Sequence, residues 1–410
     1  MPFDYTALFR PDLPPPAAGR FQGFPQYNFI GGHNDAASVP VPELAAAAAA
    51  VLAREGRDLA TYGLTSGPQG YRPLRDFIAG ALKANAGIAC SADDILVTSG
   101  SLQALDLVNG VLLAPGDTVI LEAASYGGAL SRLGRLGVRC VGVEDDADGL
   151  RTDLLAETLD ALAAEGVTPK YIYTIPTVQN PTGTVMSLAR RRALLALATR
   201  HGVPIFEDDC YADLVWEGTR PPAIRSLDDG ARVIYCGSFS KTVAPALRVG
   251  YLLADWDVLS RMLALKTDAG SGAVEQMILG EYLPAHFERH VADLTETLHG
   301  KCTAIVEALE AEFGTDAAFT APKGGIFVWV TLPEGVDTTA LAVAAAKEGV
   351  ALNPGAEWVA DPQTGRRSMR LCFGNPPVET IRAGVARLAR ICHRETGFPR
   401  RGANVVRAGE

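Results

Sequence analysis

The sequence predicts an α/β fold, with a large domain whose seven-stranded, mostly parallel sheet lies between helices, and a smaller α+β C-terminal domain. The chain has 410 residues, enough for two or three domains with sizeable cores. Between residues 85 and 255, short and nearly continuous apolar runs alternate with stretches of helical periodicity. Such runs are typical of strands buried on both faces, and the helical stretches between them imply crossover connections and a parallel sheet.

Seven apolar runs are the predicted strands of the large domain. They comprise residues 95–98, 118–121, 140–143, 171–175, 204–206, 232–236 and 250–253. A proline-rich arm, residues 1–40, and a predicted helix over residues 41–55 come before them. We therefore place the large domain at residues 41–285, behind an arm that covers residues 1–40.

After residue 255 the pattern changes to longer helices with a few strands between them. The predicted elements are helices at 258–266 and 286–313, a strand at 325–331, a helix at 338–347, a strand at 368–372 and a closing helix at 377–392. We expect the strands of this part to pair antiparallel. Residues 286–393 are assigned to the small domain and residues 394–410 to a tail.

Composition and charge restrict the class of protein. Hydrophobic residues make up 48% and charged residues 20%, values typical of a folded globular protein. The formal net charge of −10 disfavours binding to nucleic acid or anionic lipid, and no apolar run reaches the roughly 20 residues of a membrane helix. The seven cysteines are scattered without a C-x-x-C pair. We expect a cytoplasmic protein with no nucleic-acid or membrane partner.

Two familiar signatures fail on spacing. Residues 237–242 end like a phosphate-binding P-loop, but Ser240 stands where that loop needs a glycine before its lysine. His286 and His290 lie four residues apart, yet Phe287 stands where a metalloprotease keeps its general base. We therefore expect no metal site.

Polar residues follow several of the predicted parallel strands, and ligands bind at the carboxyl edge of such sheets. Residues 98–103 end a strand in small residues and begin a helix, whose exposed N–H groups suit a phosphate or serve only as a helix start. Residues 179–183 form a turn in which Asn180 can present an amide, although Asn-Pro is also a generic turn.

Two further strand ends carry charge. Residues 207–209 are three successive acids, an arrangement that is costly in a buried place unless a cation meets it. Residues 237–241 end in Lys241, flanked by hydroxyls and followed by Arg248. A single lysine is usually a solvated surface charge. Together, the four segments supply a phosphate cradle, a carboxylate for a cationic ring nitrogen, a hydrogen bond for a phenolate oxygen and an amine, which are the needs of pyridoxal 5'-phosphate.

The chain resembles the fold-type I pyridoxal-phosphate aminotransferases of the class I/II group, particularly the 2-aminoadipate, kynurenine and aromatic aminotransferase branch. The resemblance runs from about residue 27 to residue 392. Its motifs are Tyr62-Gly63, residues 70–75, residues 98–103, Tyr126, residues 180–183, Asp208 with Tyr211, residues 238–241 with Arg248, and residues 368–371.

The resemblance implies the catalytic groups. Lys241 would bind the cofactor covalently and then move a proton between the substrate Cα and the cofactor. Asp208 would pair with the protonated ring nitrogen, which makes the ring an electron sink. Asn180 and Tyr211 would hydrogen-bond the phenolate oxygen of the ring. Asp209 is the alternative acid, and its other interpretation is an acid at a helix N-terminus.

The resemblance also implies the binding groups. The phosphate would be held by Gly100, Ser101, Leu102, Ser238, Ser240 and Arg248, joined by Tyr62 from the second subunit of a homodimer. Tyr126 would stack on the ring. Arg370 would clamp the substrate α-carboxylate through a two-pronged contact, with Asn180 and Gly32 beside it. The arm would fold over the substrate, where His33 either contacts the substrate or caps the loop.

Three functions remain open at this point. The favoured one is transfer of an amino group from an L-amino acid, whether aromatic, 2-aminoadipate-like or branched, to a 2-oxo acid such as 2-oxoglutarate. The second is another pyridoxal-phosphate enzyme on the same scaffold, a β-lyase, decarboxylase or oxidase. The third is a non-catalytic, aminotransferase-like regulator. This third function is disfavoured because no winged-helix DNA reader precedes the arm. The sequence does not name the amino donor.

Overall fold

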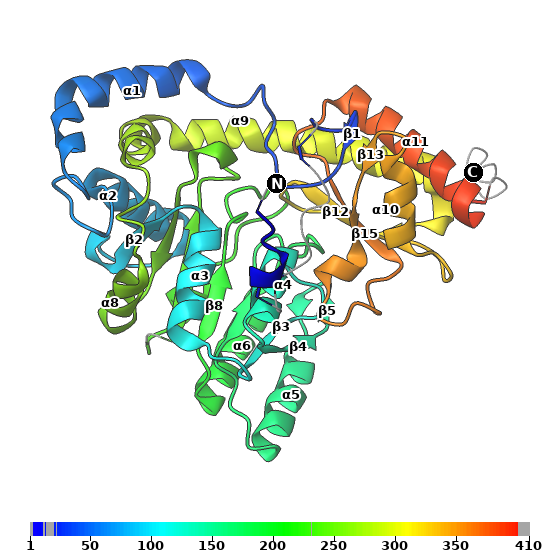
Figure 1. Ribbon diagram of the computed structural model, residues 1–410, viewed down its shortest axis with the longest axis horizontal. Coiled ribbons are helices and arrows are strands. Elements are labelled where there is room, and N and C mark those ends of the chain that lie inside the picture. Colours follow the sequence, from blue (N-terminus) through cyan, green and yellow to red (C-terminus); the bar gives the residue numbers. More distant parts are fainter. Residues whose placement is uncertain (1–2, 11–12, 14–19, 22, 231, 401–410) are drawn as a thin grey trace.

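The computed structural model describes residues 3–10, 13, 20, 21, 23–230 and 232–400. Parts of the predicted arm and residues 401–410 of the predicted tail lie outside the described residues. The body of the molecule consists of a large α/β part and a smaller part, both of which the helix α9 (Ala273–Phe313) crosses along one side (Figure 1). None of the helices in the described ranges has the length and apolar character needed to cross a bilayer.

The large part is built on a seven-stranded sheet with the order β2-β10-β9-β8-β7-β3-β4. All neighbouring pairs are parallel except those of β10, which runs antiparallel to β2 and β9. The strands are β2 (Ile95–Thr98), β3 (Thr118–Glu122), β4 (Arg139–Val143), β7 (Ile172–Thr174), β8 (Ile205–Asp208), β9 (Val233–Ser238) and β10 (Gly250–Leu253). Each predicted strand of the large domain is confirmed, as is the mostly parallel sheet.

Helices cover both faces of this sheet because its central strands are apolar on both sides. One face packs against α3 (Ser101–Leu112), α4 (Gly127–Arg135) and α8 (Trp256–Leu265). The opposite face packs against α1 (Val41–Glu55), α2 (Arg72–Ala81), α5 (Thr152–Ala164), α6 (Leu188–His201) and the first part of α9. A short helix α7 (Ile224–Leu227) and a hairpin of β5 (Asp145–Asp146) and β6 (Gly149–Leu150) complete this part.

The smaller part has a four-stranded antiparallel sheet of order β11-β12-β15-β14, as predicted for the C-terminal region. Its strands are β11 (Ala318–Phe319), β12 (Phe327–Thr331), β14 (Asn353–Pro354) and β15 (Ser368–Cys372). The end of α9, α10 (Thr338–Ala346) and α11 (Val378–Thr396) cover it. The arm joins this part, since β1 (Tyr27–Asn28) pairs with β13 (Val350–Ala351) and Phe29 enters its core.

The helices around the predicted domain boundary differ from the prediction. A helix was expected from residue 286, whereas α9 begins at Ala273 and carries Pro284 in its interior. Proline removes a helical hydrogen bond, but Met277, Leu283 and Phe287 on both sides of it are buried, so packing outweighs the local penalty. The predicted boundary at residue 285 therefore falls within one continuous helix.

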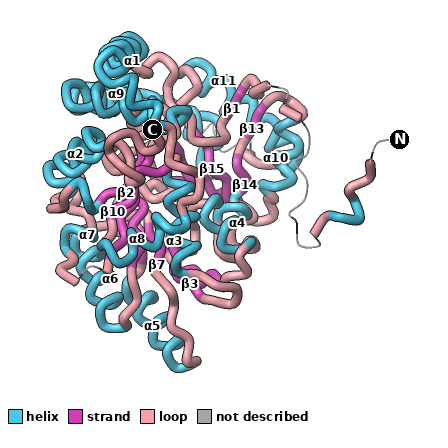
Figure 2. Tube along the Cα trace, turned by 60° about the vertical axis from the view of Figure 1, so that its left-hand side comes forward, coloured by secondary structure: helices cyan, strands magenta, loops and turns pink. Residues whose placement is uncertain are grey.

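The closing helix is also longer than predicted. α11 continues to Thr396 and ends at Gly397, whose φ of 81° lies in the left-handed region that glycine favours. The predicted tail thus begins within this helix. At the other end of the chain, residues 3–10 stand away from the body (Figure 2).

Candidate active site

A cavity of about 820 Å³ lies between the carboxyl ends of the large-sheet strands, the smaller sheet and the arm. Most of the predicted site residues line it. These are Gly32, Ser101, Leu102, Tyr126, Asn180, Asp208, Tyr211, Ser238, Ser240, Lys241, Arg248 and Arg370. The two predicted residues that do not line it are Gly100, which lies directly before Ser101, and Tyr62, which is 88% exposed.

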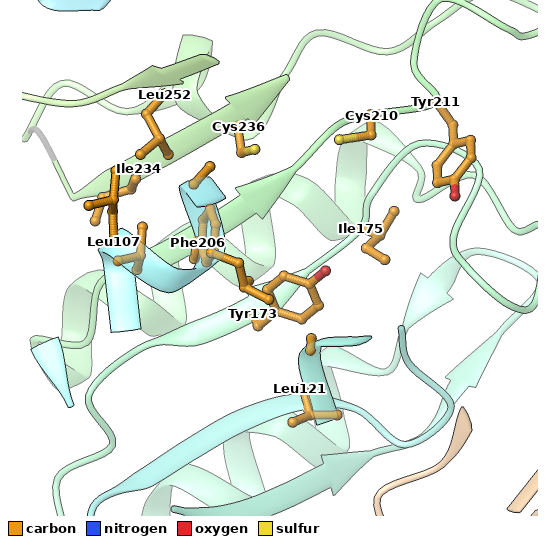
Figure 3. Packing of buried hydrophobic residues seen from close by; sticks show 14 of the residues in the cluster. Leu107, Leu121, Tyr173, Ile175, Phe206, Cys210, Tyr211, Ile234, Cys236 and Leu252 are labelled. Atoms are coloured by element: carbon orange, nitrogen blue, oxygen red, sulfur yellow. The ribbon is translucent and has the colours of Figure 1, made fainter. Parts of the chain in front are cut away.

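Asp208 ends β8 and is 8% exposed. The hydroxyl of Tyr173, on the neighbouring strand β7, donates a hydrogen bond of 2.7 Å to Asp208 Oδ2. The other oxygen, Oδ1, is buried and has no hydrogen-bond partner among the described residues. Figure 3 shows the side chains of Tyr173, on β7, and of Cys210, two residues beyond the end of β8. Burial raises the pKa of the Asp208 carboxyl, and a cation placed against Oδ1 would reverse that shift.

Lys241 follows β9 and projects into the cavity. Its Nζ donates a hydrogen bond of 2.7 Å to the carbonyl oxygen of Gly32 in the arm. Burial lowers the pKa of this amine, which increases the fraction present as the neutral nucleophile. Asn34 holds the loop from the other side, since its Nδ2 donates to the carbonyl oxygens of Lys241 (3.2 Å) and Val243 (3.3 Å).

The N-terminus of α3 forms an anion cradle beside Lys241. Gly100 precedes the helix at φ 77°, and a Cβ built there would overlap Nη2 of Arg248, so the position requires glycine. Arg248 is fixed by hydrogen bonds to the carbonyl oxygens of Ser99 (3.0 Å) and Pro245 (3.0 Å). The backbone N–H groups of Ser101 and Leu102 at the helix start, together with the guanidinium, suit a phosphate.

Arg370 projects from β15 into the cavity from the small-domain side. Its guanidinium donates to Asn180 Oδ1 (3.0 Å), the Gly31 carbonyl (2.6 Å) and Asn353 Oδ1 (2.9 Å). It also lies 3.8 Å from the centre of the Trp358 ring, and its Nε has no partner among the described residues. A planar cation held by oxygens and an aromatic face is preorganised to bind a carboxylate.

Asn180 and Tyr211 line the cavity, and Asn180 contacts Arg370. Nδ2 of Asn180 donates a 3.2 Å hydrogen bond to the Tyr211 hydroxyl oxygen. Burial raises the pKa of the Tyr211 hydroxyl well above its usual value, so it remains a proton donor. The ring of Tyr126 packs against Trp358 with ring centres 5.9 Å apart. The structure thus brings Asn180 into contact with Arg370, which lies 190 positions later in the sequence.

Asp209 does not behave as a helix N-terminal acid, so that interpretation was wrong. It is buried outside the cavity lining, and its Oδ2 accepts hydrogen bonds from Arg220 Nη2 (2.8 Å) and the Tyr235 hydroxyl (3.1 Å). Successive side chains at the end of a strand point to opposite faces, so Asp208 and Asp209 meet different surroundings. His33 does not line the cavity and packs against the ring of Phe24.

Sequence reasoning missed Tyr173, Asn353 and Trp358. Tyr173 lies in a run of apolar residues and was interpreted as part of the core; its hydroxyl, which needs a partner when buried, was the only signal. Asn353 and Trp358 lie in the segment between β13 and β15, which no motif marks. Their place at the site follows from the pairing of β14 with β15, at Asn353 and Arg370.

The comparisons with known proteins agree with this geometry. Residues 28–388 match the family described as aminotransferase class I and II. The chain is 36% identical, over 342 residues, to the aromatic-amino-acid aminotransferase 1 of Thermococcus litoralis, with 83% of this chain and 81% of the relative covered. The multiple substrate aminotransferase of Thermococcus profundus has a similar structure, with a TM-score of 0.89 at 33% identity, covering 96% of this chain and 99% of the other.

A further solved relative contains a pyridoxal derivative. The α-aminoadipate aminotransferase of Thermus thermophilus, complexed with N-(5'-phosphopyridoxyl)-L-leucine, is 33% identical with a TM-score of 0.83, covering 95% of this chain and 98% of the other. The residues of this cavity fit such a group, because an unpaired buried carboxylate oxygen, a buried amine and an anion cradle face one space. The chain therefore belongs to the class I and II aminotransferases, as an enzyme that transfers amino groups with pyridoxal 5'-phosphate as its cofactor.

Proposed function

We propose that this cavity binds an L-amino acid and then a 2-oxo acid in turn, with Lys241, Asp208 and Arg370 as its central groups. The observation that carries the proposal is the placement of three unlike groups around one space. These are a buried amine, a carboxylate with an unpartnered oxygen and a fixed guanidinium. When bound, pyridoxal phosphate supplies an electron sink for the charge left at the substrate Cα after proton removal.

Lys241 holds the cofactor and moves the proton. Its depressed pKa would leave the amine neutral, so that it could accept the proton of the substrate Cα once the substrate has displaced it and later give that proton up again. The hydrogen bond to Gly32 keeps Nζ at the arm side of the cavity, close to Arg370, whose guanidinium reaches the adjacent Gly31. A substrate held by Arg370 is therefore presented to Nζ.

Asp208 would keep the ring nitrogen protonated through Oδ1, while Tyr173 fixes Oδ2. Asn180 and Tyr211 would hydrogen-bond the phenolate oxygen, and Tyr126 would cover the ring. The phosphate would be held by Ser101, Leu102, Ser238, Ser240 and Arg248, with Gly100 leaving the space for Arg248. Arg370, Asn180 and Gly32 surround the substrate carboxylate. A substrate carboxylate that is held at several points is fixed in its orientation, and this positioning is the main contribution of such groups to the rate.

The test uses colour as well as activity. The purified protein is expected to be yellow, and borohydride reduction should attach the cofactor irreversibly to Lys241, as peptide mass analysis would show. The Lys241→Ala variant should bind the cofactor without this attachment. Label on another lysine, or on none, would refute the assignment. A panel of amino acids with 2-oxo acids, scoring amino transfer against ammonia, peroxide and carbon dioxide release, tests the reaction.

We also propose that the enzyme is a homodimer with shared sites. Tyr62 is exposed and lies outside the cavity of its own chain, and the arm presents exposed apolar side chains such as Phe3 and Tyr5. Large apolar groups exposed on an extension that stands away from the body favour contact with a second copy. Light scattering at several concentrations measures the mass, and Tyr62→Phe should weaken cofactor phosphate binding only if Tyr62 reaches the neighbouring site.

The division into arm, large domain, small domain and tail remains a proposal. It is supported by a second apolar cluster around the smaller sheet, while Leu294, Leu298, Ile326, Phe327 and Cys372 pack with the large sheet. For location we propose the cytoplasm. All seven cysteines are free, and burial raises the pKa of Cys90, Cys140 and Cys302, so these thiols are poorly reactive. Fractionation of the cells that make the enzyme tests this. We expect no nucleic-acid partner, which a filter-binding assay would check.

A further inference from the structure

We infer that the substrate side-chain pocket selects neutral side chains and discriminates against a second carboxylate. The inference rests on the proposed function, and it concerns which amino donors and 2-oxo acceptors the site accepts. It follows from the charges and the apolar groups of the residues that line the cavity.

The cavity has a cofactor end and a far end. The cofactor end contains Lys241, Asp208 and the N-terminus of α3. The far end lies between α4 and the 3-10 turn η7 (Gly355–Trp358), next to the guanidinium of Arg370. A substrate whose α-carboxylate is held by Arg370 and whose amino group faces Lys241 must direct its side chain toward this far end.

Every basic side chain that lines the cavity already has a role toward the cofactor or the α-carboxylate. Among the described residues these are Lys241, Arg248 and Arg370. Arg248 is bound to the backbone beside the phosphate cradle, and Arg370 meets the α-carboxylate. The far end therefore offers a second carboxylate no cation of its own within the part of the chain that the structure describes.

The walls of the far end are apolar and carry an acid at the rim. Leu130, Val359, Ala360 and Pro362 line it together with the Trp358 ring, and Glu357 is the acid. A carboxylate moved from water to such a place loses hydration without gaining a partner, and Glu357 adds like-charge repulsion. A methyl or aryl group at the same position gains instead from leaving water.

Two arginines of α4 lie near this end but are committed elsewhere. Arg132 donates to Asp106 (2.7 Å) and to the Gly128 carbonyl (3.2 Å). Arg135 is turned back along the helix, where it donates to the Ser131 hydroxyl (3.0 Å). Neither lines the cavity. Both are alternative sources of a cation, because Gly128 and Ser131, which accept from them, line the cavity, so the test includes both.

The experiment compares side chains of equal length in the half-reaction that bleaches the bound cofactor. L-norleucine is paired with L-2-aminoadipate, and L-norvaline with L-glutamate. We expect kcat/KM to be at least tenfold higher for the neutral member of each pair, and 2-oxovalerate to exceed 2-oxoglutarate in the reverse direction by a similar factor. Equal use of both members, within threefold, would overturn the inference.

A designed cation sharpens the test. Gly134 lines the cavity on α4, and a Cβ built there meets no atom within 4 Å, so a side chain can begin there without a clash at Cβ. Gly134→Arg should raise kcat/KM for 2-aminoadipate relative to norleucine by tenfold or more, whereas Gly134→Gln, of similar length without charge, should leave that ratio near the wild-type value. A ratio that rises equally in both variants would contradict a charge effect.

Arg132→Gln and Arg135→Gln test the remaining explanation. The ratio should not change in either variant if both arginines stay on the helix surface, and a fall in 2-aminoadipate use in one of them would show that this arginine supplies a distal cation, against the inference. Failure of the proposed function looks different. In that case no amino acid of either class would bleach the cofactor, and the ratio would not exist.

Discussion

The two walls of the cavity are built in different ways. The large-domain wall carries Asp208, Lys241 and the start of α3 at the ends of adjoining buried strands. The opposite wall joins Arg370 of β15 to Gly31 of the arm, which lies 339 positions away in the chain. The first wall is held by the sheet ladder itself, the second by side-chain contacts between distant segments. We conclude that the cofactor groups stand on a rigid sheet, while substrate recognition depends on how the two parts of the chain meet.

The largest effect should come from the large-domain wall. Lys241→Ala removes both the covalent attachment and the group that moves the proton, so turnover should fall by about 10⁴-fold. Absorbance spectra before and after borohydride, with steady-state rates, measure both losses. Lys323→Ala, a change at an exposed lysine of the small-domain side, is the matched control and should retain colour and rate. Retained turnover in Lys241→Ala would place the chemistry elsewhere.

The two acids at the end of β8 should have different roles in the large-domain wall. Asp208→Asn should lower turnover by about 10²-fold or more, because the amide cannot hold a positive charge on the ring nitrogen. Asp209→Asn leaves the buried Arg220 with one fewer anionic partner and should lower the free energy of unfolding by about 3 kcal/mol.

Kinetics and urea denaturation on both variants separate the two roles. We expect Asp208→Asn to lose turnover without losing stability. We expect Asp209→Asn to lose stability, while the molecules that remain folded keep their turnover. Equal losses of turnover at full occupancy would mean that the two acids share one function, and the distinction between the faces of β8 would fail.

The sequence predicted the cofactor wall well for a physical reason. Residues at strand ends are placed by local pattern, so the segments at 98–103, 207–209 and 237–241 could be assigned to one edge of a parallel sheet. The seven-stranded sheet followed from the same apolar runs. The start of α9 could not be predicted from the local pattern. Local propensity counts Pro284 as a break, whereas the burial of its neighbours depends on the whole fold.

The substrate wall was less accessible to prediction. Arg370 was found only through resemblance to a known family, and Asn353 and Trp358 were not found at all. Their side chains reach the cavity because β14 pairs with β15 and because η7 packs beside α4, and neither event leaves a local pattern in the sequence. Contacts between segments far apart in the chain are decided by tertiary packing.

A substitution of Arg370 tests the substrate wall without changing the cofactor wall. Arg370→Lys keeps the charge but loses the fork that donates to Asn180, Gly31 and Asn353. We expect roughly 2 to 5 kcal/mol weaker binding of every α-carboxylate substrate, seen as a higher KM with the cofactor colour intact. Arg366→Lys, at an exposed arginine of the same part, is the control. An unchanged KM would remove Arg370 from the recognition of the carboxylate.

The smallest effect on turnover should come from an acid that supports the cofactor wall from within. Glu122 ends β3 and is buried, with one oxygen accepting from Thr174 Oγ1 (2.5 Å) and the Ile175 N–H (3.1 Å). The other oxygen has no partner among the described residues. Burial raises the pKa of this carboxyl to about 7, despite those two hydrogen bonds. The fold therefore holds Glu122 protonated where an unfolded chain would ionise it.

The consequence for stability has a definite sign. Below pH 4.5 the carboxyl is protonated in both states and its contribution to folding is fully present; that contribution is lost as the pH rises toward 7, because only the unfolded chain ionises freely. Glu122→Gln cannot ionise, so its stability relative to the wild type should rise as the pH passes through this range and should reach a gain of up to about 3 kcal/mol at pH 8. Urea denaturation at pH 5 and pH 8 measures the difference. A variant advantage that is the same at both pH values would show that Glu122 is ionised in the fold, and the cofactor wall would then rest on a buried charge rather than a neutral hydrogen-bonding group.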